Sequence, residues 1–372
     1  MKKILFLVNH DVVIYNFRYE LVEALRKEGH EVVISSPNGE RIKDLQELGC
    51  KYIETEVSRH GTNPVKDFGL FLTYVKILKK EKPDIVFSYT IKPNIYGGMA
   101  CEIMGIPYVA NITGLGSAVE NGGVLQKLTT ALYKVGVHKA NRIFFQNETN
   151  MKFFEEKNII SGEYTLLPGS GVNLDKFAVL DYPDNSIIKF VFIARIMKDK
   201  GIDHYLEAAK YIKKKYPDTE FHICGFCEEQ YENVLKELHD SGLIHYHGMV
   251  KDVREILSKM HCTITPSYHE GMSNVLLESA ASGRPCLASD VPGCRETIED
   301  EKSGFLFEVK STESLIEAIE KFLSLTYEEK HVMGLCGREH VEKNFDRNIV
   351  VQAYVNEITN IFTEREKYEQ LV

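Results

Sequence analysis

Short apolar runs rich in β-branched residues alternate with amphipathic stretches along the first half of the chain. The runs are typical of buried strands and lie at residues 3–8, 31–36, 84–89, 107–112 and 142–146. Between the first two runs, the apolar residues of 16–29 fall on one helical face, with Asn16 placed to cap the start and Gly29 the end. This alternation predicts a parallel sheet with helices on both faces.

The pattern breaks at residues 167–185, where Pro, Gly, Asn and Asp indicate a linker, and then it restarts. Five more strands are expected, at residues 188–194, 220–225, 243–248, 262–267 and 285–290. A helical pattern at 314–323 follows them, and a last helix is expected at about 348–364. The expected fold class is therefore α/β, with two doubly wound, Rossmann-like domains that face a central cleft. In such sheets, ligands bind beyond the carboxyl ends of the strands.

A chain of 372 residues is too long for one ordinary core and suits two domains. We place the N-terminal domain at residues 1–175 and the C-terminal domain at 176–347. The closing residues 348–372 are expected to pack back toward the N-terminal domain.

No apolar run approaches the roughly 18–20 residues that a membrane span needs, and the first apolar run is too short for a signal peptide. Eight scattered cysteines fit reduced cytosolic thiols. The one C-x-x-C, from Cys224 to Cys227, is expected to have neither a second cysteine pair nor a nearby histidine cluster, so no zinc site is expected there. The expected location is the cytoplasm.

The net charge of −9 resides in the second half of the chain, while the first 175 residues are close to neutral. Nucleic-acid binding requires a basic face, so we expect no nucleic-acid partner. If the protein makes an electrostatic contact with another surface, we expect residues of the first half of the chain to make it.

Two cations follow the expected strand 188–194, Arg195 directly and Lys200 five residues later. At the carboxyl end of a strand they suit a diphosphate, because arginine offers a bidentate fork and lysine a point charge. The alternative is a solvated turn, where both residue types are common.

Two acids flank a predicted helix start after the strand 262–267. Glu270 lies in the turn, Ser273 or Asn274 is the expected N-cap, and Glu278 lies one turn into a helix that ends at Gly283. The helix start attracts phosphate, whereas each carboxylate can accept two hydrogen bonds from the vicinal diol of a sugar. The alternative is that Glu278 caps a neighbouring helix and Glu270 is a surface residue.

A glycosidase with paired carboxylates is a further interpretation of the two acids. It leaves Arg195, Lys200 and the helix start unexplained. It also needs a saccharide groove, normally lined with tryptophan, and the chain has no tryptophan.

Four segments resemble the donor-binding half of family-4 retaining glycosyltransferases, which have the GT-B fold: RIMKDKG (195–201), HGMVKDV (247–253), PSYHEGMSNVLLESAASGRPCLASDVPGCRETI (266–298) and SGFLF (303–307). The E-x7-E spacing from Glu270 to Glu278 is the signature of that family. The resemblance covers essentially the whole second half of the chain.

This resemblance implies that Arg195 and Lys200 bind the donor diphosphate, that Glu278 binds the ribose and that Glu270 binds the transferred sugar. It implies catalytic roles for Arg195, Lys200 and Glu270. The implied donor site consists of Asn16, Arg195, Lys200, Met249, Glu270, Gly271, Met272, Ser273, Asn274, Val275 and Glu278. The donor would be a UDP-hexose or a UDP-N-acetylhexosamine, with residues 246–250 beside the base.

The chain contains no D-x-D motif, which many glycosyltransferases use to hold a divalent metal. Arg195, Lys200 and the helix start can neutralise the leaving diphosphate instead, so we expect a metal-independent reaction without a cofactor. The resemblance implies retention of the anomeric configuration, with the acceptor attacking on the leaving-group face.

Segments of the first half resemble bacterial family-4 enzymes that extend undecaprenyl-diphosphate-linked saccharides for glycan or capsule assembly. They are NHDVVIYNFR (9–18), SRHGTNP (58–64), KPNIYGGMA (92–100) and NITGLGSAV (111–119). The resemblance implies a lipid-linked saccharide acceptor, bound by His10, Arg18, Arg59, Lys92, Thr113 and Gly114. Two alternatives remain open: His10 as a turn histidine satisfied by backbone, and Arg18 paired with Glu20 or Glu23.

A lipid-linked acceptor requires a membrane-facing surface. Residues 66–84 offer an apolar helix followed by Lys79, Lys80 and Lys82, and basic residues near an anionic leaflet contribute about 1 kcal/mol each. The alternative is a helix buried on the sheet whose lysines suit its dipole. Peripheral binding to the inner face of the plasma membrane is left open.

Other functions remain as alternatives. A catalytically silent nucleotide-sugar-binding subunit would be expected to lack Glu270 or the pair Arg195 and Lys200. An epimerase or a phosphorylase could use a similar scaffold, but nothing marks the lysine that a pyridoxal phosphate cofactor would need.

Overall fold

The computed structural model describes residues 1–58, 63–115, 123–184 and 186–371. Contacts divide the chain into two compact units. The N-terminal unit comprises Met1–Ser170 together with Asn348–Val372, and the C-terminal unit is the continuous segment Gly171–Arg347.

The N-terminal unit is built on a parallel sheet whose described strands run in the order β3-β2-β1-β4-β5-β6-β7. The strands are β1 (Lys3–Leu7), β2 (Glu31–Ser36), β3 (Lys51–Glu54), β4 (Ile85–Tyr89), β5 (Tyr108–Ile112), β6 (Arg142–Phe145) and β7 (Glu163–Leu166). The five strands expected here are confirmed. The edge strands β3 and β7 were not expected, because both are largely exposed and lack an apolar run.

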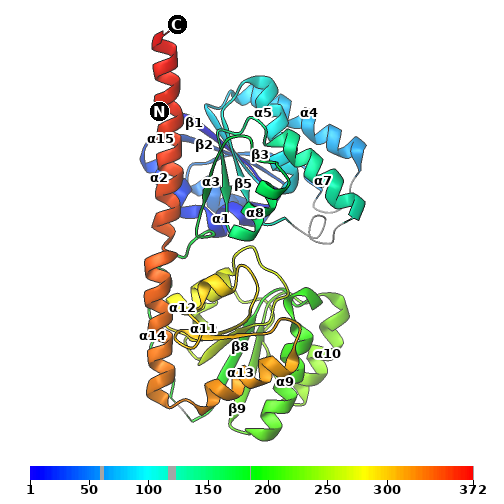
Figure 1. The fold of residues 1–372 in the computed structure, drawn as a ribbon, viewed down its shortest axis with the longest axis vertical. Coiled ribbons are helices and arrows are strands. Elements are labelled where there is room, and N and C mark those ends of the chain that lie inside the picture. The colour runs from blue at the N-terminus through cyan, green and yellow to red at the C-terminus, as the bar shows by residue number, and fades with distance from the viewer. Residues whose placement is uncertain (59–62, 116–122, 185, 372) are drawn as a thin grey trace. The chain divides into compact units, whose positions relative to one another are not determined.

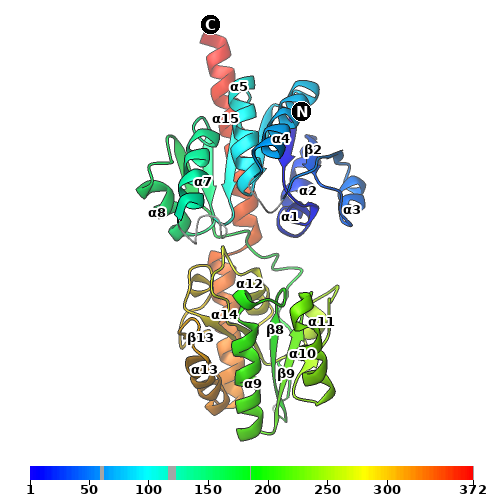
Figure 2. The same ribbon diagram turned by 90° about the vertical axis from the view of Figure 1, so that its right-hand side faces the viewer.

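Helices cover both faces of this sheet, as the alternating pattern predicts (Figure 1). One face carries α4 (Pro64–Glu81), η1 (Pro93–Gly97), α5 (Gly98–Met104), α7 (Gly123–Gly136) and α8 (Glu148–Glu156). The other carries α1 (Asp11–Phe17), α2 (Tyr19–Lys27), α3 (Ile42–Glu47) and α15 (Arg347–Leu371). In Figure 2, α4, α5 and α7 lie in front of the sheet and α15 lies behind it.

The start expected for the helix at residues 16–29 is wrong, because α2 begins at Tyr19. Asn16 does not cap a helix but lies inside the last turn of α1, which is capped by the His10 side chain. Helical structure is interrupted at Arg18, which separates α1 from α2. Helical periodicity continues across this break, so the pattern of apolar residues does not reveal it.

The last helix, α15, completes the core of the N-terminal unit. Its residues Val350, Tyr354, Ile358 and Ile361 are buried in the cluster that contains β1, β2 and β4. The Tyr354 hydroxyl accepts a hydrogen bond from Arg18 Nε at 3.1 Å and donates to Asn111 Oδ1. The closing segment therefore belongs to the unit formed by the start of the chain.

The C-terminal unit has a second parallel sheet, with described strands in the order β10-β9-β8-β11-β12-β13. They are β8 (Ile188–Ile193), β9 (Thr219–Cys224), β10 (His245–Tyr246), β11 (Cys262–Thr265), β12 (Cys286–Ser289) and β13 (Gly304–Phe307). The five strands expected from the sequence are present, although β10 is shorter than expected. The edge strand β13 was not expected.

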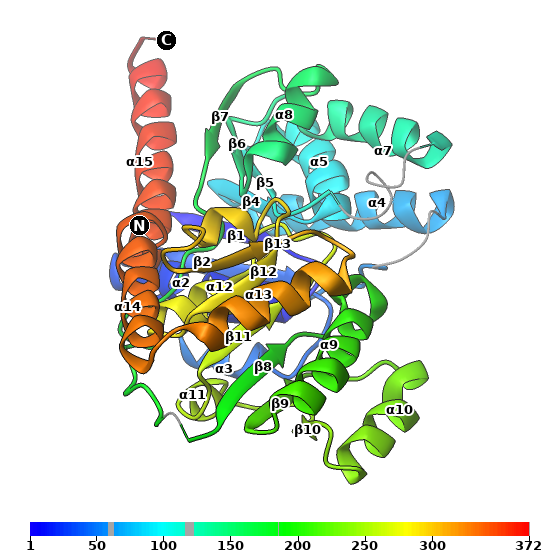
Figure 3. The ribbon, with the colours of Figure 1, turned by 60° about the horizontal axis from the view of Figure 1, so that its bottom comes forward.

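One face of this second sheet is covered by α9 (Ile202–Lys215), α10 (Glu229–Asp240) and α13 (Thr312–Ser324). Figure 3 shows α9 and α13 side by side over the strands. The other face carries α11 (Arg254–Leu257), α12 (Asn274–Ala281) and α14 (Tyr327–Asn344). Among the helices that the structure describes, none combines the length and apolar character needed to cross a bilayer.

Candidate active site

The loops after β8, β9 and β11 meet at the carboxyl edge of the second sheet because two glycines allow their backbones to touch. A Cβ atom on Gly201 would lie 1.9 Å from the carbonyl oxygen of Pro266. A Cβ atom on Gly225 would lie 1.7 Å from the carbonyl oxygen of Ala194. Any side chain at either position would force these loops apart.

Lys200 and Glu270 come together across these loops. Lys200 ends the 3-10 turn η2 (Lys198–Lys200), and its Nζ lies 2.6 Å from Glu270 Oε1. Ser267 Oγ donates to the same carboxylate oxygen at 2.8 Å. Glu270 is therefore not a free surface residue, because its side chain is only 16% exposed and has two partners.

Arg195 lies on the same edge, directly after β8 and Ala194. It is exposed, and its Nε lies 3.0 Å from Met197 Sδ. The structure thus places the two predicted diphosphate-binding cations in one loop, with Lys200 held by an acid and Arg195 extended toward solvent.

The turn that carries Glu270 is fixed by a contact with Gly293. A Cβ atom on Gly293 would lie 2.6 Å from the Glu270 carbonyl oxygen, and the Ser273 N–H donates to the Gly293 carbonyl at 2.8 Å. Ser273 is the N-cap of α12, as one of the two expected caps, and its Oγ accepts from the Leu276 N–H. The start of α12 is therefore held beside the Lys200–Glu270 pair.

Glu278 lies in the second turn of α12 and is half-buried. Burial raises the pKa of its carboxyl to about 7, while Lys176 and Arg347 act in the opposite direction and Asp252 adds to the rise. Among the helices whose capping side chain the structure describes, none is capped by Glu278, so the alternative role as a helix cap has no support. A desolvated carboxylate here suits hydroxyl donors.

The remaining donor-site residues of the C-terminal unit also lie around α12 or the loop after β10. Met272 is buried, and Asn274 Nδ2 donates weakly to its carbonyl at 3.4 Å. Gly271 and Val275 are half-buried, whereas Met249 is 74% exposed. Asn16, the one donor-site residue predicted from the first half, belongs to the N-terminal unit.

The N-terminal unit places two predicted acceptor residues in supporting positions. His10 Nδ1 accepts from the Val12 N–H at 3.2 Å, which matches the alternative of a histidine satisfied by backbone. Arg18 is 2% exposed, and its Nε donates to the Tyr354 hydroxyl at 3.1 Å. A buried guanidinium favours packing over ligand binding, and the acceptor role of Arg18 stays a prediction.

The other predicted acceptor residues lie around β4 and β5. Lys92 Nζ forms an ion pair of 2.7 Å with Asp67, which also accepts from the Tyr96 hydroxyl. Thr113 and Gly114 follow β5 and are half-buried. Arg59 lies outside the described residues.

Sequence reasoning missed Lys176 and Arg347, the two cations whose charges act on Glu278. They lie far from it in sequence, at the two ends of the C-terminal unit, and no motif links them to it. Gly293 lies within the segment 266–298, but only the fold reveals that it supports the Glu270 turn.

Among the described residues, the one group of three or more candidate ligands is Glu220, His222 and His245, on β9 and β10. That group does not include Cys224 or Cys227.

Two family models match the chain. The model described as Glycosyl transferases group 1 matches residues 181–340, and the model described as Glycosyl transferase 4-like matches residues 3–147. Together they cover the active-site loops of the C-terminal unit and the strands β1–β6 of the N-terminal unit.

Curated relatives cover two thirds or more of the chain. An N,N'-diacetylbacillosaminyl-diphospho-undecaprenol alpha-1,3-N-acetylgalactosaminyltransferase from Campylobacter jejuni is 30% identical over 94% of this chain and 96% of its own length. A UDP-Gal:alpha-D-GlcNAc-diphosphoundecaprenol alpha-1,3-galactosyltransferase from Escherichia coli is 29% identical over 68% of this chain and 70% of its own.

Solved structures with low sequence identity share the fold. A sucrose-phosphate synthase from Thermosynechococcus elongatus has a TM-score of 0.81 at 17% identity, covering 98% of this chain and 100% of its own. Anabaena HepE in complex with UDP and glucose has a TM-score of 0.78 at 14% identity, covering 97% and 100%. The expected GT-B fold, with two parallel-sheet Rossmann-like units, is confirmed.

Proposed function

The chain belongs to the group 1 glycosyltransferases, and we propose that it moves a hexose or an N-acetylhexosamine from a UDP-sugar to a lipid-linked saccharide. The observation that carries this proposal is the Lys200–Glu270 pair beside the capped start of α12, with Glu278 one turn further along the helix. The cations proposed for the diphosphate and the acid proposed for the transferred sugar thus lie in the loops after β8 and β11, and the acid proposed for the ribose lies in α12.

In this proposal the donor diphosphate lies against Arg195, Lys200 and the first N–H groups of α12. Lys200 already has a carboxylate partner at 2.6 Å, so a phosphate oxygen would share or take over its ammonium group. Glu270 would then accept hydrogen bonds from hydroxyls of the transferred sugar. Glu278, which lies deeper along the helix, would accept from the ribose diol.

The proposed reaction needs no metal ion. The bond from the anomeric carbon to the diphosphate oxygen breaks, and negative charge develops on the departing UDP. Arg195, Lys200 and the helix start are fixed positive groups at this edge of the sheet, so they can stabilise that charge.

Retention of configuration is part of the proposal. The acceptor hydroxyl would attack the anomeric carbon on the face that UDP leaves, forming the new C–O bond as the old one breaks. The hydroxyl proton would pass to an oxygen of the leaving diphosphate. In this scheme the protein supplies position and charge, and it needs no covalent nucleophile.

The lipid-linked acceptor rests on the relatives whose names include diphospho-undecaprenol substrates, and on an exposed apolar stripe of α4. Val65, Phe68 and Leu72 are 81%, 59% and 41% exposed, and their spacing puts them on one side of the helix. Lys79 and Lys80, both exposed, lie in the last turn of α4. An apolar stripe with a basic end suits the surface of an anionic bilayer.

The buried side of α4 packs on the first sheet through Leu70, Tyr74 and Leu78. The alternative of a helix buried on the sheet is therefore correct for that side. It leaves the exposed stripe unexplained, so the two roles belong to different faces of one helix. Peripheral membrane binding is accordingly part of the proposal.

The test is donor binding followed by transfer. Thermal shifts are measured with UDP, GDP and their sugars, and the preferred donor is then incubated with undecaprenyl-diphosphate-linked saccharides. We expect stabilisation by UDP and transfer that persists in EDTA, with the new linkage keeping the donor's anomeric configuration. Loss of transfer in EDTA that magnesium restores would reject metal independence, and donor binding without transfer or hydrolysis would favour a silent binding subunit.

A further inference from the structure

A cluster of histidine and glutamate side chains lies on the edge of the second sheet, away from the active-site loops. Glu220 and His222 are two residues apart in β9, so their side chains point to the same face. His245 begins the edge strand β10 and is the register partner of His222. Glu220 pairs in register with Lys189, near the amino-terminal end of β8, whereas Arg195 and Lys200 follow its carboxyl end.

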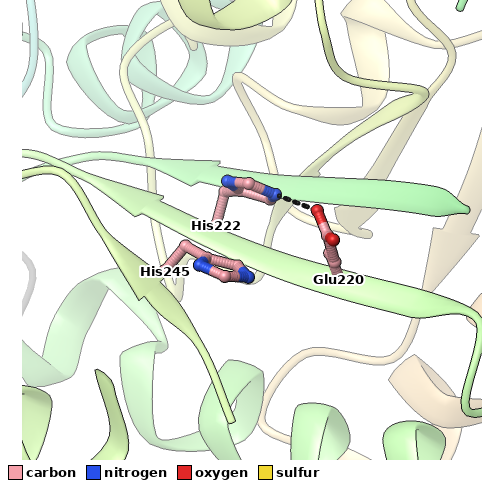
Figure 4. Close-up of side chains that lie close together, drawn as sticks. All are labelled: Glu220, His222 and His245. Carbon is pink, nitrogen blue, oxygen red and sulfur yellow. Dashed lines mark hydrogen bonds and ion pairs between the residues drawn. The ribbon is translucent and has the colours of Figure 1, made fainter. Parts of the chain in front are cut away.

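The three side chains converge closely. His222 Nε2 lies 3.2 Å from Glu220 Oε2, and the rings of His222 and His245 stack with centroids 4.8 Å apart. One ligand atom from each residue lies within 4.8 Å of the others. Figure 4 shows His222 and Glu220 directed at each other, with His245 alongside.

His222 is also oriented from its other side. Its Nδ1 lies 2.9 Å from His247 Nε2, two residues beyond His245, and the two rings are almost parallel. Histidine ligands of metals usually have their second ring nitrogen held by a hydrogen-bonding partner, which fixes the ring and its tautomer. With Nδ1 engaged by His247, His222 presents Nε2 toward Glu220 and His245.

We propose that Glu220, His222 and His245 bind a divalent transition-metal ion, with Zn²⁺ the best match. Two imidazoles and one carboxylate are ligands that Zn²⁺ prefers, and a water molecule would complete a tetrahedron. The side chains of Glu220 and His222 are 24% and 9% exposed, so the site is sheltered but reachable. Ligand atoms bound about 2.0–2.2 Å from a tetrahedral ion lie closer to one another than 4.8 Å, so metal binding would draw these three side chains together.

The ion would join the edge strand to the rest of the sheet. In the described part of the chain, β10 has two residues and pairs with β9 alone. A metal bridge between β9 and β10 would hold this short strand more firmly than its few backbone hydrogen bonds. The role is structural, and it is independent of the proposed transfer reaction and of the metal independence of that reaction.

Lys189 is the group that competes for this site. Its Nζ lies 3.4 Å from Glu220 Oε2, the oxygen that also faces His222. A bound cation would displace this ammonium group or be weakened by it. Removing the lysine charge with Lys189→Gln is therefore expected to strengthen metal binding, and a weaker binding in that variant would contradict the placement of the ion on Glu220.

The experiment is Zn²⁺ titration of the untagged full chain by calorimetry, with circular dichroism to confirm folding. We expect one Zn²⁺ per chain and at least a tenfold weaker affinity in His245→Ala and in Glu220→Gln, because even outer-shell partners of zinc ligands are typically worth about 10–100-fold. These two positions are preferred to the buried His222, whose replacement could disturb folding. His138→Ala is the matched control, since His138 is exposed and lies in the N-terminal unit.

Co²⁺ provides a second readout that does not depend on activity. Visible absorption bands of tetrahedral Co²⁺ should appear with the wild type and with His138→Ala, and should be lost with His245→Ala. The proposal is overturned if the wild type binds no Zn²⁺, or if His245→Ala and Glu220→Gln keep the wild-type affinity and stoichiometry.

Discussion

Lys200 Nζ lies 2.6 Å from Glu270 Oε1, so the cation assigned to the donor diphosphate is paired with the acid assigned to the transferred sugar. Each side chain holds the other in place across the loops that follow β8 and β11. In the proposed function, a phosphate that binds Lys200 would weaken its ion pair with Glu270, which would leave the Glu270 carboxylate able to accept hydrogen bonds from sugar hydroxyls. One exchange of partners would then prepare both groups.

The first prediction follows from this pair. Lys200→Met is expected to lower turnover by about 100-fold or more, because it removes a cation from the place where negative charge develops on the leaving diphosphate. Glu270→Gln is also expected to lower turnover, because it removes the carboxylate that in the proposed function accepts hydrogen bonds from the transferred sugar. Since the residues are in contact, the double variant should lose less than the product of the two single losses. Steady-state rates of the four proteins measure this coupling.

Lys198→Ala provides the control for that cycle, because Lys198 lies in the same turn but is exposed. Its turnover should stay close to that of the wild type. Full multiplicativity of the Lys200 and Glu270 effects would mean that the two groups act independently.

Glu278 gives the second prediction, on pH. Burial raises the pKa of its carboxyl to about 7, above that of an unfolded chain, so the folded protein holds this proton more tightly. Its contribution to stability is complete below the unfolded pKa and is lost as pH rises through about 7. The glutamine side chain of the Glu278→Gln variant cannot ionise, so this loss is absent from the variant. The melting temperature of the variant minus that of the wild type should therefore increase as the pH rises from 5 to 8.

Ionisation of Glu278 should have the opposite effect on UDP binding: it lowers stability but should raise the affinity for UDP. An ionised carboxylate is the better acceptor for a ribose diol, so wild-type affinity for UDP should increase as pH rises through about 7. The affinity of Glu278→Gln should be lower and lack this rise. For the stability prediction, a difference in melting temperature between the wild type and Glu278→Gln that stays constant from pH 5 to 8 would argue against a raised pKa of Glu278.

Gly201 supplies the third prediction. Gly201→Ala would place a Cβ atom 1.9 Å from the Pro266 carbonyl oxygen, at a φ of +73°. Gly242 has the same φ of +73° and nothing within 4 Å, so Gly242→Ala carries the backbone strain alone. We expect a loss in free energy of unfolding of about 1 kcal/mol for Gly242→Ala and of more than about 2 kcal/mol for Gly201→Ala.

Urea unfolding of both variants tests this comparison. Equal losses would indicate that the loops after β8 and β11 separate easily. A further decrease in UDP affinity is expected only for Gly201→Ala, because this glycine follows Lys200 directly.

The fourth prediction concerns the attachment of α15. Tyr354→Phe removes the hydroxyl that meets Arg18 Nε and Asn111 Oδ1, leaving buried polar groups without this partner. A decrease of about 1–3 kcal/mol in the free energy of unfolding is expected. Tyr74→Phe is the control, because the buried Tyr74 hydroxyl has no hydrogen-bond partner within the described chain.

Chemical denaturation measures both tyrosine variants. Tyr74→Phe should be neutral or slightly stabilising. If Tyr354→Phe were equally neutral, the polar contacts of α15 would contribute nothing beyond apolar packing.

The fifth prediction concerns the membrane surface. Lys79→Ala/Lys80→Ala should reduce sedimentation with anionic vesicles, since each lysine contributes about 1 kcal/mol near such a surface. Lys210→Ala/Lys214→Ala, two exposed lysines of α9 in the C-terminal unit, removes the same charge elsewhere. Equal binding by both double variants would remove these α4 lysines from the proposed contact.

The interior of both sheets was predictable because buried parallel strands are continuous apolar runs. The edge strand β7 escaped prediction, since its exposed residues Glu163 and Tyr164 give no such signal. The break between α1 and α2 also escaped, because the apolar spacing is helical on both sides of Arg18. Asn16 was consequently assigned to the wrong end of a helix.

The composition of the candidate site was visible in the sequence, but its pairings were not. Lys200 and Glu270 are 70 residues apart, and nothing local indicates that they form an ion pair. The cluster of Glu220, His222 and His245 was missed for a similar reason. E-x-H in one strand and H-x-H in the next place these side chains on one face only once the two strands are known to be neighbours.

The place of α15 in the first core has a consequence for biosynthesis. The residues that fill this core from α15 extend to Phe362, whereas the second unit is one uninterrupted stretch ending at Arg347. During translation the downstream unit can therefore reach its native state before the upstream one, whose apolar surface stays uncovered until the ribosome has delivered the final helix. That interval is when a chaperone would be most useful to this polypeptide.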